Sequence, residues 1–591
     1  MFLVTTANQN FWKTDEKILF LGEWCKIYDQ KHIWSKIDHE TFPSNWDKWE
    51  DFDQRYKYLE SVCEKYLNSF VLSLNDSHDE NHSLRYWRIV LGPWLNFFVG
   101  NIYDKYLSIK SAIESKKVTQ TWIPSLKPRQ WLPSDTITFL LRAAGNNNFN
   151  LYLYGRVINK LRQIPFEHKE DKSFSELLGG SGSLPLPSPA KGKGIIRKLL
   201  EEFSKRTSGR FNQVVFSSSG FSLQDQWKLH LSLGQIPFSI LPQITSCQLP
   251  INESLRKNIK PPQETNEFES ILNDLIIEQL PTSFLEGYST MRNKSLDAFP
   301  KRPKVIFTSN DFAFNEGFKL WAATKVEQGV KLILSQHGGG YGFQGPLVTE
   351  NHELKVCDKY FTWGWTKNEE PKVLPLSSLK LSSTNHNEKF KLKGTILWVS
   401  ETLPLFFIRI DHVVTGLIGS KYFLRQASFL NVICPEVSKI LLLRFPSRKC
   451  EWNGEKRLVD NYPSIKWYKG EDSILSQLQK SKLCIHDYLG TTWLETLSIN
   501  FPTVVFCDLS SVKIIASAQP YLDDLRRVRI LHDSPESAAE FINKIHEDPM
   551  SWWVTSELQQ VRKKFCNQFA RKSENYLEEW REELLKMVKK S

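Results

Sequence analysis

The sequence lacks the features that mark secreted, membrane-spanning and zinc-binding proteins. Its nine cysteines are an odd number, and no two of them have Cys-x-x-Cys spacing. This pattern argues against a disulfide framework or a zinc site and favours a reducing compartment. The first residues lack the basic-then-apolar order of a signal peptide, and no apolar run approaches the roughly 20 residues that span a bilayer. We therefore expect a cytoplasmic protein, and leave open its attachment to the inner face of the cytoplasmic membrane.

Common nucleotide-binding and hydrolase motifs are also missing. There is no Walker A loop, no Gly-x-Ser-x-Gly elbow and no His-Glu-x-x-His motif. An Asp-x-Asp triplet, Asp51-Phe52-Asp53, lies in an aromatic, helix-like stretch with no strand before it, so it is weak support for a metal-held nucleotide. We predict a metal-independent protein without a bound cofactor.

Charge and composition narrow the choice of ligands. The net charge of +11 is modest for 591 residues, and it suits an anionic ligand such as a nucleotide sugar, or an anionic membrane surface. The charge is not concentrated in one arm or helix, which argues against nucleic-acid binding. Twenty tryptophans and 13% aromatic residues fit large cores as well as surfaces that stack on sugar rings.

Short apolar runs alternate with helical periods along most of the chain, which predicts an α/β fold of two or three domains. The predicted strands are 17–22, 305–309, 331–335, 360–365, 395–399, 440–444, 483–486 and 503–506. Residues 48–115 have a helical period, and Gly92-Pro93 should break or kink a helix there. Residues 179–194 have the composition of a flexible loop, and 366–392 are polar and predict an interdomain linker.

The strongest candidate for chemistry follows the predicted strand 331–335. It reads Gln336-His337-Gly338-Gly339-Gly340-Tyr341-Gly342. Glycines let the backbone approach a ligand closely, and their consecutive N–H groups form a nest for phosphate or carboxylate. His337 can donate to a phosphate or act as acid or base near neutral pH. A tight turn with a structural histidine is the alternative, but the position at a strand end favours a functional loop.

A second candidate is the strand end and turn His486-Asp487-Tyr488-Leu489-Gly490-Thr491-Thr492. Thr491 and Thr492 would lie at a helix N-terminus, where free N–H groups and the helix dipole favour a phosphate. Glu495, one turn into the helix, would be close enough to reach a ribose. A capping box formed by Thr492 and Glu495 is the alternative.

Three further positions carry polar side chains just after or at predicted strand ends. Asp311 and Glu316 follow strand 305–309 and should be the carboxylates nearest the Gly-rich loop, as nucleophile or base. A helix N-cap at Asp311 or Asn315 is the alternative. Arg444 ends strand 440–444 and could neutralise a diphosphate or carboxylate.

Several spaced motifs together resemble a family of transferases associated with O-antigen biosynthesis loci, over nearly the full length. They are Phe2-Leu3-Val4-Thr5-Thr6 with Leu21-Gly22-Glu23-Trp24-Cys25, Gly92-Pro93-Trp94, the Gly-rich loop 336–342, Trp363-Gly364-Trp365, and His486-Asp487-Tyr488 with Thr492-Trp493-Leu494-Glu495-Thr496-Leu497. More distantly, the His-Gly loop and the later strand–Gly/Thr–helix turn are similar to GT-B enzymes with cytidine-activated donors. These are the Kdo transferases of capsule and O-antigen, which use CMP-Kdo, and the CDP-glycerol glycerophosphotransferases, whose loop is of a His-Gly-Thr type.

The resemblance implies a GT-B-like fold, in which two Rossmann-like domains face a central cleft. Residues 1–375 would form the acceptor-side domain with helical insertions, and 390–550 the nucleotide-binding domain. A C-terminal helical region, 551–591, interrupted near 569–573, would pack back on the N-terminal domain. His337 would correspond to the histidine of the N-terminal loop, 486–495 to the nucleotide-binding turn, and Glu23 to a position where such folds often keep an acceptor-activating base.

The leading hypothesis is therefore transfer of a sugar, such as Kdo or a related ulosonic acid from its CMP form, onto a glycan or lipid-linked glycan acceptor of a surface polysaccharide. The reaction would occur between His337 and Asp311, and the residues leave open whether it inverts or retains the anomeric configuration. Transfer of a polyol phosphate and a non-catalytic role in glycan assembly are the alternatives.

Overall fold

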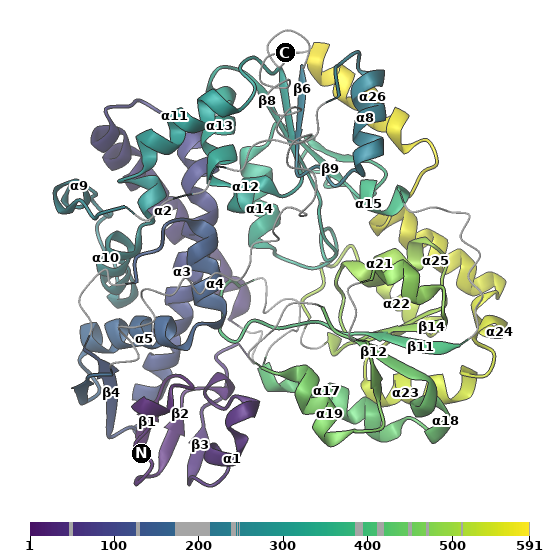
Figure 1. Cartoon of the computed structure of the whole chain (residues 1–591), viewed down its shortest axis with the longest axis horizontal. Coiled ribbons are helices and arrows are strands. Elements are labelled where there is room, and N and C mark those ends of the chain that lie inside the picture. Colours follow the sequence, from purple (N-terminus) through teal and green to yellow (C-terminus); the bar gives the residue numbers. More distant parts are fainter. Residues whose placement is uncertain are drawn as a thin grey trace, which may run out of the picture.

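The computed structural model contains three parallel β-sheets, which we call the first, middle and C-terminal sheets (Figure 1). It describes every residue except 47–50, 126–130, 172–212, 238–243, 245, 247–248, 384–393, 411–418, 447–451, 469–471, 510–511 and 590–591. The loop predicted at 179–194 lies outside the described residues.

The strand orders are β3-β2-β1-β4-β5 in the first sheet, β10-β9-β8-β7-β6 in the middle sheet and β13-β12-β11-β14-β15-β16 in the C-terminal sheet. The first sheet comprises β1 (Phe2–Val4), β2 (Ile18–Phe20), β3 (His39–Thr41), β4 (Gln120–Pro124) and β5 (Phe166–Lys169). The middle sheet comprises β6 (Val214–Ser217), β7 (Val305–Thr308), β8 (Lys331–Ser335), β9 (Lys359–Thr362) and β10 (Val373–Pro375). The C-terminal sheet comprises β11 (Thr395–Val399), β12 (Leu441–Arg444), β13 (Lys466–Trp467), β14 (Ser481–His486), β15 (Thr503–Phe506) and β16 (Leu531–His532).

The strands that the sequence predicts are confirmed, because they are short apolar runs covered on both faces. β7 is buried throughout, and β8 is buried from Leu332 to its end. The expected linker is partly wrong, since 366–392 contains the edge strand β10 and a short helix, α15 (Leu379–Ser382). Its polar composition reflects the edge position of β10, which has a neighbour, β9, on one side only.

Helices cover the sheets and fill the space between them. In the N-terminal half they are α1 (Lys31–Trp34), α2 (Phe52–His78), α3 (Leu84–Glu114), α4 (Thr136–Gly145), α5 (Asn147–Leu161), α8 (Leu223–Ser232), α9 (Glu253–Lys257), α10 (Glu267–Gln279), α11 (Tyr288–Ala298), α12 (Asp311–Phe314), α13 (Glu316–Glu327) and α14 (Val348–Val356). After β11 they are α17 (Gly419–Val432), α18 (Pro435–Ile440), α19 (Gly454–Asn461), α20 (Ile474–Leu478), α21 (Thr491–Ser498), α22 (Gln519–Arg527), α23 (Pro535–Ile545), α24 (Pro549–Trp553), α25 (Ser556–Phe569) and α26 (Tyr576–Lys589). Within the described ranges, no helix combines the length and the apolar content that would let it cross a membrane.

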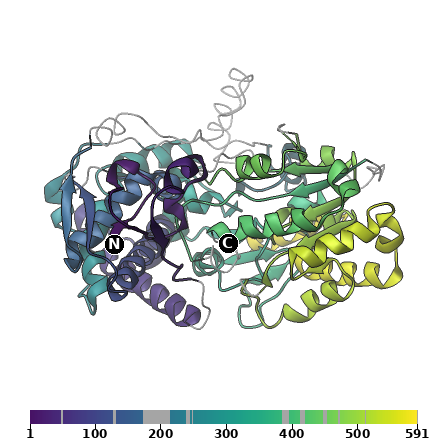
Figure 2. The same cartoon turned by 90° about the horizontal axis from the view of Figure 1, so that it is seen from below.

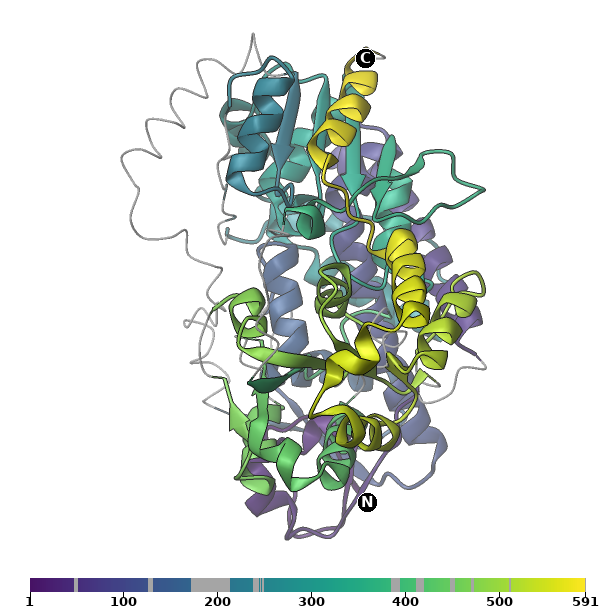
Figure 3. The same ribbon diagram turned by 90° about the vertical axis from the view of Figure 1, so that its right-hand side faces the viewer.

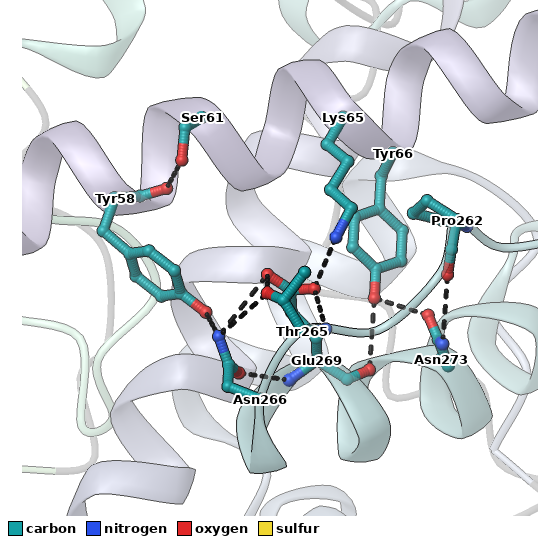
Figure 4. A network of polar contacts seen from close by, with 9 residues as sticks. All are labelled: Tyr58, Ser61, Lys65, Tyr66, Pro262, Thr265, Asn266, Glu269 and Asn273. Carbon is teal, nitrogen blue, oxygen red and sulfur yellow. Dashed lines mark hydrogen bonds and ion pairs between the residues drawn. The ribbon is translucent and has the colours of Figure 1, made fainter.

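The two longest helices, α2 and α3, stand between the first and middle sheets (Figure 1). Helix α3 continues through Pro93 and does not break there. A Cβ on the preceding Gly92 would lie 2.6 Å from the ring of His352 on α14, so the glycine serves close helix packing. Hydrogen bonds and an ion pair also connect α2 with α10 (Figure 4). In this network the Tyr66 hydroxyl donates to Asn273 at 2.5 Å, and Lys65 pairs with Glu269 at 2.7 Å.

The end of the chain joins the C-terminal sheet to the middle sheet. α25 packs on α21 and α22, and α26 packs on α8 and β7. Helix α25 ends before residues 570–575 and α26 begins after them, so these residues interrupt the C-terminal helical region. Trp580 on α26 is buried against Phe307 of β7 and Phe361 of β9. Figure 3 shows α25 and α26, in yellow, running from the C-terminal sheet up to the middle sheet.

The fold is α/β and GT-B-like, as predicted, because two Rossmann-like sheets turn their carboxyl ends toward each other. The structure adds a separate parallel sheet, the first sheet, to the N-terminal part. Figure 2, seen from below, shows the N-terminal elements on one side and the C-terminal elements on the other. The segment after β11 crosses between them, since Leu405 and Phe406 donate their N–H groups to the carbonyl of Ala144 on α4.

Candidate active site

The two candidate segments of the sequence meet at one point. The Gly-rich loop follows β8 of the middle sheet, and the Gly490-Thr491 turn follows β14 of the C-terminal sheet. Gly339 N donates to Thr491 Oγ1 at 2.9 Å. A Cβ on Gly339 would lie 2.1 Å from the carbonyl oxygen of Gly490, so only glycine allows this approach. The carboxyl ends of the two sheets are therefore in backbone contact here.

Gln336 holds the loop in shape. It is buried, and its Oε1 accepts from Trp363 N at 3.0 Å and from Trp365 Nε1 at 2.8 Å, while its Nε2 donates to Gly338 O at 2.9 Å. The predicted nest of free amides is partly wrong. Gly339 N already donates to Thr491, and Gly342 N donates to Glu350 at 3.3 Å. Gly340 has a φ of 92°, a left-handed conformation that favours glycine.

A buried carboxylate lies beside His337. Glu353 on α14 is fully buried, and its Oε1 is 3.6 Å from His337 Nδ1. The same carboxylate accepts from the hydroxyls of Tyr341 at 2.8 Å and Tyr360 at 2.6 Å. The Tyr341 hydroxyl lies 3.4 Å from both ring nitrogens of His337. Glu353 thus lies close to the imidazole, and the Tyr341 hydroxyl, which donates to Glu353, is the polar group nearest to both ring nitrogens.

The guanidinium of Arg409 also acts on His337. Burial and the nearby Arg409 guanidinium lower the pKa of His337 to about 4. The ring is therefore neutral at pH 7 and can accept a proton, although 28% of the side chain is exposed. Arg409 comes from the segment that crosses from β11 onto the N-terminal helices, where Asn101 Nδ2 donates to Phe407 O at 2.6 Å. Sequence reasoning missed both Glu353 and Arg409.

The expectation that Asp311 and Glu316 are the carboxylates nearest the Gly-rich loop is wrong. Glu353 and Glu350 occupy that place. Asp311 accepts from Ser217 of β6, and burial raises the pKa of its carboxyl. Phe312, the next residue, is the one that faces His337, with ring centroids 6.1 Å apart.

Glu316 points toward α4. It is buried, pairs with buried Lys319 at 2.7 Å, and accepts from Thr136 N at 2.9 Å. Asn315 caps α13 by accepting from Phe318 N at 3.0 Å, so the N-cap alternative is confirmed for Asn315. These contacts turn Glu316 away from the loop, toward the N-terminus of α4.

Glu23 lies in the first sheet, on the short 3-10 helix η2 (Glu23–Cys25) after β2. It pairs with Lys26 at 3.0 Å, and its side chain is 40% exposed. The helix η2 contacts α17 of the C-terminal part. None of the contacts of the described residues joins Glu23 to the Gly-rich loop.

The side chains of His486 and Asp487, at the end of β14, are buried. His486 is fully buried, and its Nε2 lies 3.2 Å from Thr496 Oγ1; burial lowers its pKa to about 3. Asp487 accepts four hydrogen bonds, which come from Trp398, Ser400, Tyr422 and Gln426 at 2.7–3.1 Å. Both were expected to bind the nucleotide, but their side chains are used to build the strand end beneath the turn.

The turn itself remains available at the N-terminus of α21. Gly490 is the N-cap residue and makes no side-chain bond, so the capping box of Thr492 and Glu495 is wrong. The Thr492 hydroxyl lies 3.3 Å from the Tyr488 hydroxyl. Glu495 instead pairs with Lys380 of α15 at 2.5 Å, which is a further contact between the two parts of the chain.

Arg444 is directed along the edge of the C-terminal sheet. Its Nη2 donates to Asp472 O at 2.8 Å, and its guanidinium lies 5.5 Å from the ring of Tyr468. No described contact brings it to Thr491. Asp53 of the Asp-x-Asp triplet pairs with Lys513 and Asp51 with Arg55.

The topology places this turn where doubly wound sheets bind ligands. In the C-terminal sheet, β11 and β14 are neighbours and the chain leaves them in opposite directions, toward β12 and toward β15. Ligands bind at such a switch point, outside the carboxyl ends of the strands. Here those ends carry Ser400 and Asp487, whose side chains are hydrogen-bonded at 2.8 Å. A phosphate at the first turn of α21 would also face the Gly-rich loop.

Comparison with known proteins gives the class and then the family. The parallel sheets, with a glycine-rich loop that faces a helix N-terminus, define an α/β protein of the GT-B-like class. The profile described as LIC12162 family transferase matches residues 1–584, and the chain belongs to this family. No curated protein matches the sequence. Among solved structures it is similar to the crystal structure of Acinetobacter baumannii MurG, at 10% identity and a TM-score of 0.32, over 63% of this chain and 99% of that chain.

Proposed function

We propose that this transferase is a glycosyltransferase that takes a sugar from a nucleotide-activated donor and transfers it to a glycan acceptor. The observation that carries the proposal is the bond from Gly339 N to Thr491 Oγ1. It brings a helix N-terminus, a Gly-rich loop and a histidine with a buried carboxylate to one place. Sugar transfer from a nucleotide needs these three parts: an anion site for the leaving phosphate, room at the backbone and a base.

In this proposal the donor phosphate binds at the first turn of α21. The first amides of a helix have no intrahelical acceptor, and the helix dipole favours an anion there. Arg409, whose charge acts on both His337 and Tyr341, adds a cation near the Gly-rich loop. Thr491 and Thr492 supply hydroxyls, and no metal ion is needed to hold the phosphate in this arrangement.

His337 is the proposed base. Its neutral imidazole takes the proton of the acceptor hydroxyl, and the oxygen forms a bond to the anomeric carbon. The bond from that carbon to the phosphate oxygen breaks, and the electron pair leaves with the nucleotide. Glu353 stabilises the resulting imidazolium, as the buried acid does in catalytic triads. A single displacement of this kind inverts the anomeric configuration.

The identity of the donor is proposed from the resemblance of the motifs. It favours a cytidine nucleotide, with Kdo or a related ulosonic acid as the sugar and a surface polysaccharide, or its lipid-linked precursor, as the acceptor. An acidic sugar also fits a site with Arg409. The lipid-linked acceptor would bring the enzyme to the inner face of the cytoplasmic membrane.

The test is release of CMP from CMP-Kdo by the full-length protein and by His337→Ala. Removal of a general base lowers kcat by about 10²- to 10⁴-fold, whereas His32→Ala, an exposed histidine of α1, should leave it unchanged. Equal turnover by His337→Ala and the wild-type protein would refute the assignment of the base. Turnover of CDP-glycerol but of no CMP-sugar would replace sugar transfer by polyol-phosphate transfer.

A further inference from the structure

A second hollow lies between the first sheet and the C-terminal sheet, apart from the Gly-rich loop. Its cavity volume is about 380 Å³. Its walls come from the ends of β11, β12 and β13, from the start of α19 and from Asp29 after β2. Pockets of this size at the carboxyl ends of parallel strands are common ligand sites.

Aromatic rings form its floor and sides. Phe423 and Trp452 are buried, with ring centroids 5.9 Å apart, and Trp452 Nε1 donates to Pro404 O at 3.0 Å. Phe445 and Trp467 are half-buried and line the same hollow. Gly454 closes the wall, since a Cβ there would lie 2.5 Å from the ring of Phe423. The hollow is thus lined by two buried and two half-buried aromatic side chains.

Among the residues that the structure describes, three carboxylates, Asp29, Glu401 and Glu455, and one cation, Lys456, line the hollow. Lys456 is itself held by Asp29, at 2.6 Å. A phosphate or an acidic sugar would be repelled by this set of carboxylates. Neutral hydroxyl groups, in contrast, can donate hydrogen bonds to carboxylates, and such charge-assisted bonds are strong.

The hollow adjoins the proposed donor turn. Glu401 follows β11 directly, and its N–H donates to the Tyr422 hydroxyl at 2.8 Å. The same hydroxyl donates to Asp487, which precedes the turn Tyr488–Thr491, at 2.8 Å. After burial, the charge of Glu401 is the largest cause that raises the pKa of Tyr488. A ligand here would therefore lie next to the donor without overlapping its phosphate site.

We propose that this hollow binds a neutral sugar unit of the glycan acceptor, stacked on Trp467 and Phe445 and hydrogen-bonded to Glu401, Asp29 and Glu455. The inference rests on the proposed transfer to a glycan. It assigns the acceptor, and not the donor, to the space between the first and C-terminal sheets. It also gives the first sheet a function, because Asp29 closes one side of the hollow.

The test uses the full-length protein, with neutral trisaccharides of glucose, galactose or N-acetylglucosamine as probes and a sialylated trisaccharide as the acidic comparison. Binding is followed by saturation-transfer NMR at up to about 10 mM saccharide, a range suited to millimolar Kd values. At least one neutral probe should bind, and the acidic one should bind more weakly. Trp467→Ala, Glu401→Gln and Glu455→Gln should each weaken it, by about 10-fold or more for the tryptophan. Glu547→Gln, which changes an exposed carboxylate just after α23, is the matched control and should change nothing.

CMP binding, measured on the same variants by thermal shift, separates this inference from the proposed function. Unchanged CMP binding with weakened saccharide binding supports an acceptor subsite. Loss of CMP binding in Trp467→Ala with no effect on saccharides would make the hollow a nucleobase pocket and overturn the inference. The absence of any saccharide binding to the wild-type protein would overturn it as well. A protein that binds saccharide in the hollow but no nucleotide anywhere would refute the proposed function and leave the subsite standing.

Discussion

Gly339→Ala should separate the two turns that form the candidate site. The new Cβ would lie 2.1 Å from the carbonyl oxygen of Gly490, 2.4 Å from its carbonyl carbon and 2.9 Å from Thr491 N. All three are backbone atoms, so no side-chain rotation can relieve the clash. Gly338→Ala is the matched control, because its Cβ would meet Thr491 Oγ1 at 3.6 Å, an ordinary contact.

The size of the effect follows from two terms. Overpacking against fixed backbone costs about 1–3 kcal/mol. Loss of the hydrogen bond from Gly339 N to Thr491 Oγ1 adds about 1 kcal/mol. We expect Gly339→Ala to lower the free energy of unfolding by about 2–4 kcal/mol, and Gly338→Ala to lower it by less than about 1 kcal/mol.

The assay is thermal and urea unfolding of both variants, with and without CMP. Gly339→Ala should lose the stabilisation by CMP as well as basal stability, because the phosphate site includes the displaced turn. Gly338→Ala should retain both. If the two variants behave alike, or if Gly339→Ala binds CMP as the wild-type protein does, the contact between the two turns does not form the donor site.

Three further substitutions test single contacts. Glu353→Gln should lower kcat by about 10-fold or more and shift the pH profile of kcat, because the loop histidine loses its neighbouring carboxylate. Glu350→Gln should leave that pH profile unchanged. Equal pH profiles for the two variants would refute a role of Glu353 beside the histidine. If Glu495 binds ribose, Glu495→Gln should weaken CMP binding. Lys380→Met breaks the same 2.5 Å ion pair and should leave CMP binding unchanged. If calorimetry shows that both variants lose CMP affinity equally, Glu495 acts through the ion pair alone. Burial lowers the pKa of His486 from 6.5 to about 3. As the pH falls, the unfolded chain therefore takes up this proton before the folded protein does. The contribution of His486 to the free energy of unfolding is complete above pH 6.5 and falls by up to ~1.4 kcal/mol per pH unit below it. His486→Gln should flatten the urea-unfolding slope between about pH 6 and 4, and an unchanged slope would contradict this cause.

The predictable parts of the molecule are those that local sequence determines. Strand β8 and the loop after it follow from an apolar run ending in glycines, and the chain places that loop at the carboxyl edge of the sheet. The same reasoning located the turn after β14. The first sheet is only partly predictable: β2 lies in an apolar run that a glycine ends, whereas the short strand β3 is polar in sequence.

The unpredicted parts depend on contacts between distant segments. Glu353 reaches His337 from α14, and the available signal was its spacing of one helical turn from Glu350 just after the loop. Arg409 comes from the segment that leaves the other sheet, and no local pattern indicates that crossing. Asp487 looked like a ligand because it ends a strand, but four donors from the C-terminal part use its carboxylate.

The central claim is that a cytidine nucleotide binds where Gly339 meets Thr491. The most direct measurement is the thermal unfolding of the wild-type protein and of Thr491→Val with CMP, CDP, UDP, GDP and dTDP. A ligand at 100-fold its Kd adds about 2.7 kcal/mol of stability. We predict that CMP and CDP stabilise the wild-type protein and that Thr491→Val loses most of this gain. Stabilisation only by uridine or guanosine nucleotides, or equal stabilisation of both proteins, would contradict the claim.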